Sequence, residues 1–144
     1  MEKRQGFTLV ELVVVVMILG ILAAVAAPKL LGTSGTATDN GLRQTLSVVR
    51  DAIERYAAEN GGDFPGTNEA TFKSAITPYL RGTFPTCPVG NKNANVDVTN
   101  AGVTPLGVNA GATTGWRYDY QTGEFIVNSS DSDNSDTPVA YNTY

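Results

Sequence analysis

The residue best placed to do chemistry in this 144-residue chain is a carboxylate inside an apolar segment. From Phe7 to Ala27 the only charged side chain is that of Glu11. An ionised carboxylate in apolar surroundings is costly unless a cation or hydrogen-bond donors satisfy it. The segment itself carries no Lys or Arg. The remaining cation would be an α-amine, created if the chain were cut just before the apolar run.

Few other side chains are candidates for catalysis. The absence of histidine removes the commonest general base and metal ligand, and the single cysteine, Cys87, excludes an intrachain disulfide. Without a histidine to activate it, Cys87 is expected to be a small buried residue. Asp119 and Glu124 flank a predicted hairpin and are expected to be solvated carboxylates at a strand edge. We therefore expect no enzymatic activity.

The acidic C-terminal stretch is a candidate cation site. Its oxygen ligands would come from Ser130, Asp131, Asp133 and Asp136, and Ca²⁺ is a hard cation that prefers oxygen. The start of the stretch resembles an EF-hand loop, but the glycine and the final glutamate of that loop are missing. A solvated acidic loop is the alternative interpretation.

The segment from Phe7 to Ala27 has the length of a membrane span. As a helix its 21 residues would extend about 31 Å, close to the thickness of a bilayer core. Lys3 and Arg4 precede it, which favours a cytoplasmic N-terminus. The alternatives are a buried core helix and a secretory signal peptide cleaved near Ala26. A charged residue favours a retained anchor, because intramembrane carboxylates are functional-site candidates by default.

The rest of the chain predicts one small α+β domain. A helix is indicated by an apolar stripe at spacings of three and four, and Gly61 and Gly62 would end it. The stripe comprises Leu42, Leu46, Val49, Ile53 and Tyr56. The stretch between Pro28 and Gly41 could be a loop or a helix that can melt locally. The net charge of −4 and the lack of a basic cluster beyond the N-terminus argue against nucleic-acid binding.

Two further elements are indicated in the C-terminal half. Asn68 would cap a short helix, which the buried side chains Phe72, Ile76 and Leu80 would mark. Alternating aromatic and aliphatic residues from Trp116 to Val127, with a turn at residues 121–123, predict an antiparallel hairpin. Residues 89–114 show no clear period and are expected to be irregular, with one short strand at most.

The run from Gly6 to Leu12 resembles the class III signal of type IV pilins and type II secretion pseudopilins. The resemblance implies that a prepilin peptidase cuts after Gly6 and methylates the new N-terminal Phe7. It also implies that Glu11 faces the Phe7 amine of a neighbouring subunit, with a glutamate that snorkels to the cytoplasmic interface as the alternative. Pro28 matches a proline that the family often has near the end of the anchor. Major pseudopilins often bind Ca²⁺ in a C-terminal loop, but their ligands do not align clearly with this tail.

The resemblance implies a pilin-like α+β fold with a long N-terminal helix and a C-terminal antiparallel sheet. The expected parts are a leader (1–6), an anchor (7–31), a periplasmic helical spine (32–62) and a globular region (63–144). The chain would be a single-pass inner-membrane subunit of a secretion pseudopilus, a pilus or a DNA-uptake filament. Its partners would be like or related subunits, the peptidase, a platform protein and an ATPase. A secreted soluble binding domain, cleaved near Ala26, is the alternative from a different class.

Overall fold

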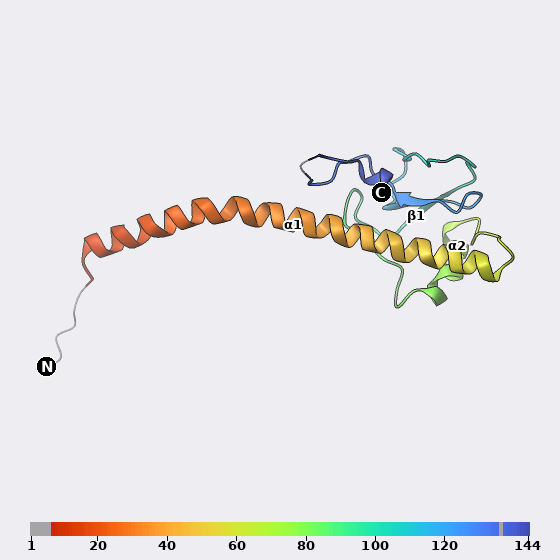
Figure 1. Ribbon diagram of the computed structural model, residues 1–144, viewed down its shortest axis with the longest axis horizontal. Helices are drawn as coiled ribbons and strands as arrows, with labels where there is room; N and C mark the ends of the chain where they lie inside the picture. The colour runs from red at the N-terminus through yellow and green to blue at the C-terminus, as the bar shows by residue number, and fades with distance from the viewer. Residues whose placement is uncertain (1–6, 136) are drawn as a thin grey trace. The chain divides into compact units, whose positions relative to one another are not determined.

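The computed structural model describes residues 7–135 and 137–144, with backbone only for residues 28–34. The chain divides into two compact units, one up to Gly35 and one from Thr36 to Tyr144. Helix α1 (Leu9–Glu59) contributes to both (Figure 1). The backbone is therefore helical through Pro28 and up to Gly41, where the sequence also allowed a loop. The domain boundaries expected from the sequence stay predictions.

Helix α1 ends just before Gly61 and Gly62, as predicted. Gly61 and Gly62 have φ of +72° and +100°, a region that residues with a Cβ rarely adopt. The Gly62 amide donates to the carbonyl of Ala57 at 2.8 Å, which satisfies a carbonyl that the last helical turn leaves without a partner. The chain can then reverse toward the rest of the domain.

The predicted short helix is present as α2 (Glu69–Ile76), followed by the 3-10 turn η1 (Thr77–Tyr79). Its N-cap is Asn68, whose side chain accepts from the Thr71 amide at 3.0 Å. The Thr71 hydroxyl accepts from the Asn68 amide in return, at 3.2 Å. This reciprocal pair is a capping box, so the predicted cap is confirmed.

The sheet has three strands in the order β1 (Val96–Thr99), β2 (Trp116–Asp119) and β3 (Phe125–Val127). β2 and β3 form the predicted antiparallel hairpin, and Trp116 pairs with Val127. β1 pairs with β2 in parallel, so the sheet is mixed rather than wholly antiparallel. The long loop between β1 and β2 returns the chain to the same end of the sheet, which a parallel pair requires. A last 3-10 turn, η2 (Tyr141–Thr143), follows.

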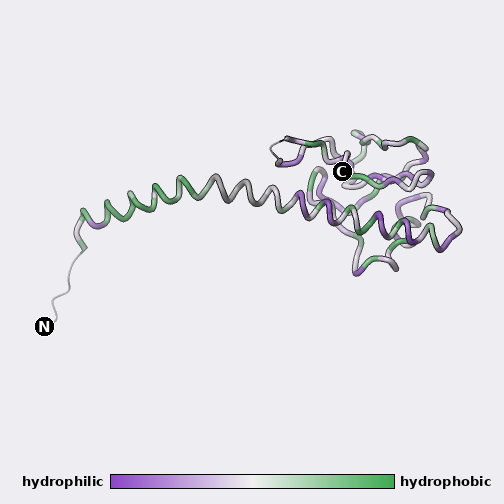
Figure 2. The backbone as a smooth tube through the Cα atoms, in the orientation of Figure 1, coloured by the Kyte–Doolittle hydropathy of each residue, from purple (hydrophilic) through white to green (hydrophobic). Residues whose placement is uncertain are grey.

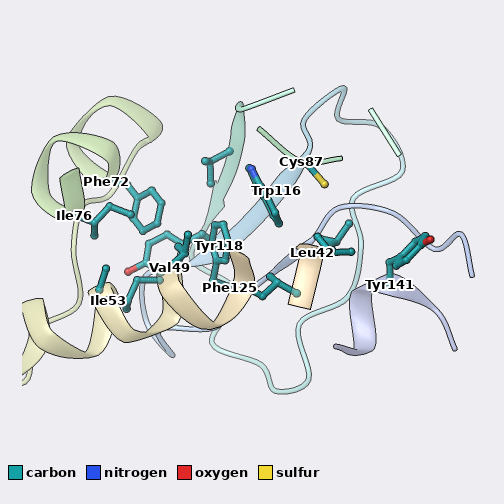
Figure 3. Close-up of a cluster of buried hydrophobic side chains, with 14 of the residues drawn as sticks. Leu42, Val49, Ile53, Phe72, Ile76, Cys87, Trp116, Tyr118, Phe125 and Tyr141 are labelled. Carbon is teal, nitrogen blue, oxygen red and sulfur yellow. The ribbon is translucent and has the colours of Figure 1, made fainter. Parts of the chain in front are cut away.

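One core joins the C-terminal part of α1, α2 and the sheet (Figure 3). The predicted stripe of α1 supplies its helical wall, although Tyr56 is only half-buried. Aromatic side chains fill the space opposite: Phe72 of α2 stacks on Tyr118 with ring centroids 4.1 Å apart, and Trp116 lies 5.1 Å from Phe125. Phe72 and Ile76 are buried as predicted, whereas Leu80 is half-buried. The fold is thus a small α+β domain built against one helix.

Two buried tyrosines in this domain make a matched pair for mutation. The Tyr118 hydroxyl has no hydrogen-bond partner among the described residues, whereas the Tyr141 hydroxyl donates to the Asp39 carboxylate at 2.7 Å. A buried polar group without a hydrogen-bond partner destabilises the fold, whereas a hydrogen bond to a charged acceptor stabilises it. We predict that Tyr118→Phe leaves the free energy of unfolding unchanged or raises it by about 1 kcal/mol, and that Tyr141→Phe lowers it by about 1–3 kcal/mol.

Urea unfolding of the full chain in detergent micelles would measure both changes. Equal destabilisation by the two substitutions would contradict the assignment of hydrogen-bond partners.

Candidate functional site

The first turn of α1 holds the carboxylate that the sequence singled out. Thr8 directly precedes the helix, and its amide and hydroxyl donate to Glu11 Oε2 at 2.9 and 2.8 Å. The Glu11 amide donates to the Thr8 hydroxyl oxygen at 3.2 Å. These bonds form a second capping box and satisfy two amides that a helix start leaves without partners. Glu11 therefore has a role within its own chain, besides any role toward a neighbour.

Sequence reasoning missed this cap although the signal was present. The pattern Thr-x-x-Glu directly before an apolar run is the signature of a capping box. The prediction used the charge of Glu11 and not its position in the first helical turn. Both Thr8 bonds end on Oε2, and within the described residues no donor bonds to Oε1. One carboxylate oxygen is thus engaged and the other is left for a further donor.

The helix from Leu9 to Ala27 is apolar and its side chains are not buried. Among the described residues, one helical stretch, Leu9–Ala27, is long and apolar enough to cross a membrane, with a mean hydropathy of 2.9 and none of it buried. Figure 2 shows this hydrophobic stretch along the first part of α1. Phe7, next to it, is 81% exposed. So large an apolar surface requires lipid or other apolar helices around it, which supports membrane anchoring.

The structure locates the predicted site residues to different degrees. Glu11 lies in the first turn of α1 and Phe7 lies two residues before the helix begins, so an amine on Phe7 and the carboxylate would be close to the same membrane boundary. Gly6 lies outside the described residues. Pro28 lies in the helical backbone of α1, within the stretch described by backbone alone. The processing and assembly roles of these residues stay predictions.

The C-terminal segment contains the candidate Ca²⁺ ligands, which differ in exposure. Ser130 and Asp131 are exposed, Asp133 is buried, and Asp136 lies outside the described residues. In the part of the chain that the structure describes, no three Asp, Glu or Cys side chains gather as they would around a metal ion. Ca²⁺ binding stays a prediction of the sequence.

Asp133 instead belongs to a cluster that fastens the C-terminal segment to α1. We call it the helix–tail clasp, and it comprises Asp39, Arg43, Asp133, Asn134, Tyr141 and Tyr144. The Arg43 guanidinium lies 3.3 Å from the Asp133 carboxylate and 3.8 Å from the centre of the Tyr144 ring. The Asp39 carboxylate accepts from the Asn134 amide at 2.9 Å. Nothing in the local sequence pattern points to these contacts, which join residues about 90 positions apart.

Asp119 and Glu124 are not a solvated pair at a strand edge. Asp119 is fully buried, and its two oxygens accept from the amides of Gly102 and Gln121 at 2.7 and 2.9 Å. Glu124 accepts from the Leu106 amide at 2.9 Å. The prediction was wrong for Asp119 because this carboxylate anchors the loop between β1 and β2, whose path the sequence did not indicate. Both carboxylates thus hold loop backbone.

Cys87 lies in the core, as predicted. Its side chain is fully buried, and burial raises the pKa of the thiol to about 11. A thiol with so high a pKa is protonated at neutral pH and is a poor nucleophile.

An exposed apolar helix that continues into a small α+β unit defines a pilin-like architecture. Residues 1–27 match the family model described as "Prokaryotic N-terminal methylation motif". The type II secretion system core protein G of Escherichia coli (strain K12) is 32% identical over 79 residues, which are 55% of this chain and 54% of the relative. The core protein G of Vibrio cholerae is 38% identical over 69 residues, 48% of this chain and 47% of the relative.

A third relative carries a different name. The prepilin peptidase-dependent protein D of Escherichia coli is 40% identical over 62 residues, 43% of this chain and 42% of the relative. The chain spans about half the length of the curated relatives it matches. No solved structure matches it significantly. The methylation motif and these relatives support the resemblance to the type IV pilins and type II secretion pseudopilins.

The clasp predicts how stability depends on pH. Hydrogen bonds from the Tyr144 hydroxyl, from Ser135 and from the Val139 amide hold the pKa of the Asp133 carboxyl well below its ordinary value of 3.8. A group with a depressed pKa contributes stability that is fully present above the unfolded pKa and is lost as the pH falls through the folded pKa. We predict that the wild type loses stability below about pH 4 more steeply than Asp133→Asn.

Urea unfolding over this acidic range and at neutral pH would compare the two chains in micelles. At neutral pH the variant should be the less stable of the two. If the two unfolding free energies fell in parallel below pH 4, the Asp133 contacts would contribute no pH-dependent stability.

Proposed function

We propose that this chain is a structural subunit of a type II secretion pseudopilus or of a related pilus-like filament. A prepilin peptidase would cut between Gly6 and Phe7, and the processed chain would assemble through α1. The observation that carries the proposal is Glu11, a carboxylate at the start of an exposed apolar helix, with one oxygen that no described residue bonds. The names of the relatives favour secretion over a surface pilus or DNA uptake.

Cleavage would supply the cation that the apolar segment lacks. The new α-amine on Phe7 would be a second costly charge at the same membrane boundary. Each charge is satisfied when Glu11 of one subunit meets the amine of a neighbour, because the open Oε1 accepts while Oε2 stays bonded to Thr8. The capping box therefore need not break when subunits pack.

This ion pair would set the axial register of the helices more than their affinity. The desolvation cost of two buried charges offsets much of their attraction, so a matched pair contributes little net stability while a mismatched one is strongly unfavourable. Affinity would come from packing the exposed apolar side chains of α1 against those of other subunits. The domain from Thr36 onward would then be carried into the filament by its own part of α1.

The partners are those that the resemblance implies. They are like or related subunits, the peptidase, a platform protein and an ATPase, at an inner membrane with a cytoplasmic N-terminus and the domain on the far side. A secreted binding domain cleaved near Ala26 is the competing function, favoured only by the small residues at the end of the apolar run. It gives Glu11 no role in the mature chain.

The intact mass of the protein from membranes of a host with a prepilin peptidase tests the processing step. We expect a chain that begins at Phe7 and carries one added methyl group. Gly6→Leu should leave the full-length chain in the membrane. A soluble product that begins near Ala27 would refute the proposal in favour of the secreted domain.

Two substitutions at Glu11 separate the cap from the charge. Glutamine can still serve in a capping box but carries no charge, whereas valine can do neither. We predict that Glu11→Gln and Glu11→Val both insert into the membrane and both fail to form filaments, as measured by shearing and electron microscopy. Normal filaments from Glu11→Gln would contradict the ion pair and leave only the capping role.

A further inference from the structure

The buried carboxylate of the C-terminal segment is surrounded by donors from its own chain. Asp133 is 7% exposed. Its Oδ1 accepts from the Ser135 amide at 3.2 Å, the Ser135 hydroxyl at 2.7 Å and the Val139 amide at 3.0 Å. Its Oδ2 accepts from the Tyr144 hydroxyl and from Arg43 Nη2. Both oxygens are therefore occupied, and the charge is balanced by the Arg43 guanidinium.

Arg43 reaches the segment from α1 and holds two of its residues. Its guanidinium lies over the Tyr144 ring, 3.8 Å from the centroid, while one of its nitrogens contacts Asp133. The Tyr144 ring meets the Tyr141 ring edge-on, with centroids 5.6 Å apart. A planar guanidinium can donate to a carboxylate and stack on an aromatic ring at the same time, which an ammonium cannot do as well.

A second set of contacts to the segment lies one helical turn earlier on α1. Asp39 is 6% exposed, and its carboxylate accepts from the Tyr141 hydroxyl at 2.7 Å and from the Asn134 amide at 2.9 Å. Residues four apart lie on the same face of a helix, so Asp39 and Arg43 act side by side. The segment accepts from Arg43 through the Asp133 carboxylate, and it donates to the Asp39 carboxylate through Asn134 and Tyr141.

These residues do not fit a divalent cation. Ca²⁺ takes six to eight oxygen ligands at about 2.3–2.6 Å, and the oxygens of Asp133 already accept from protein donors. The described neighbours Ser130 and Asp131 are exposed, and the Asp131 amide donates to the Ser129 hydroxyl. An incoming ion would have to displace Arg43 and several hydrogen bonds to reach Asp133.

We propose that Arg43 is the resident cation of the C-terminal segment, in the role that Ca²⁺ plays in a metal-dependent loop. The described residues of the C-terminal segment, 131–135 and 137–144, then fold onto α1 through the clasp, without added metal. The charge is part of the chain, so the clasp forms whatever the calcium concentration outside the cell. This proposal does not depend on the filament, because every group in it belongs to one chain.

Hydrogen exchange on the full chain in detergent micelles tests the proposal locally. The reporters are three backbone amides of the segment. The Asp133 amide donates to the Val139 carbonyl, and the Tyr141 amide donates to the Asp131 carbonyl. The Val139 amide donates to the Asp133 carboxylate. Each chain is measured with millimolar Ca²⁺ and with a chelator. The variants are Arg43→Met, which keeps an apolar stem and removes the charge, and Arg43→Lys, which keeps the charge and loses the planar group. Arg55→Met, on an exposed site of the same helix outside the clasp, is the matched control.

In the wild type we expect the same protection with Ca²⁺ and with the chelator. Arg43→Met should speed exchange of the three reporters by about tenfold or more, the factor that corresponds to about 1.4 kcal/mol. Arg43→Lys should give a smaller increase, and Arg55→Met should leave all three rates unchanged. The proposal is overturned if the chelator speeds exchange in the wild type and Ca²⁺ restores it, because calcium would then be the cation. Unchanged rates in Arg43→Met would overturn it as well.

Discussion

A carboxylate in the first turn of an apolar helix has few ways to satisfy its charge. Glu11 uses one oxygen to cap its own helix through Thr8, and no donor among the described residues bonds to the other. The apolar segment up to Ala27 carries no Lys or Arg, and its side chains require lipid or other helices as cover. The described segment therefore needs apolar cover, and Glu11 needs a further donor besides Thr8. In the proposed filament both needs would be met, because each processed subunit would bring an amine and an apolar helix together.

In the domain, charged side chains are satisfied by groups of the same chain. Its core forms where the apolar stripe of α1 meets the aromatic side chains of α2 and the hairpin. Charges are then used to hold segments that the core does not cover. Asp119 and Glu124 anchor the loop between β1 and β2, and Asp39 and Arg43 hold the C-terminal segment. In each case a charged side chain fixes loop backbone or a partner side chain at a defined position.

Local signals in the sequence predicted local structure well. The Asn68 cap, the glycine stop after α1 and the hairpin at residues 116–127 each depend on a few neighbouring residues, and all are present. The parallel strand β1, the buried Asp119 and the clasp depend on contacts between distant parts of the chain, which no periodicity encodes. Of the candidate site, the sequence identified Glu11 and its missing cation. The Thr8 cap was also encoded, in the spacing of Thr8 and Glu11, but the prediction used only the charge of Glu11.

The central claim is that Glu11 keeps its cap and pairs with the amine of a neighbour. The most direct test is a cryo-electron microscopy structure of filaments grown from the processed wild-type chain, at a resolution that shows side chains. The account predicts the Phe7 amine of one subunit within hydrogen-bond distance of the Glu11 carboxylate of another, with Thr8 still bonded to the second oxygen. A Glu11 side chain that contacts only Thr8, with the Phe7 amine elsewhere, would contradict it.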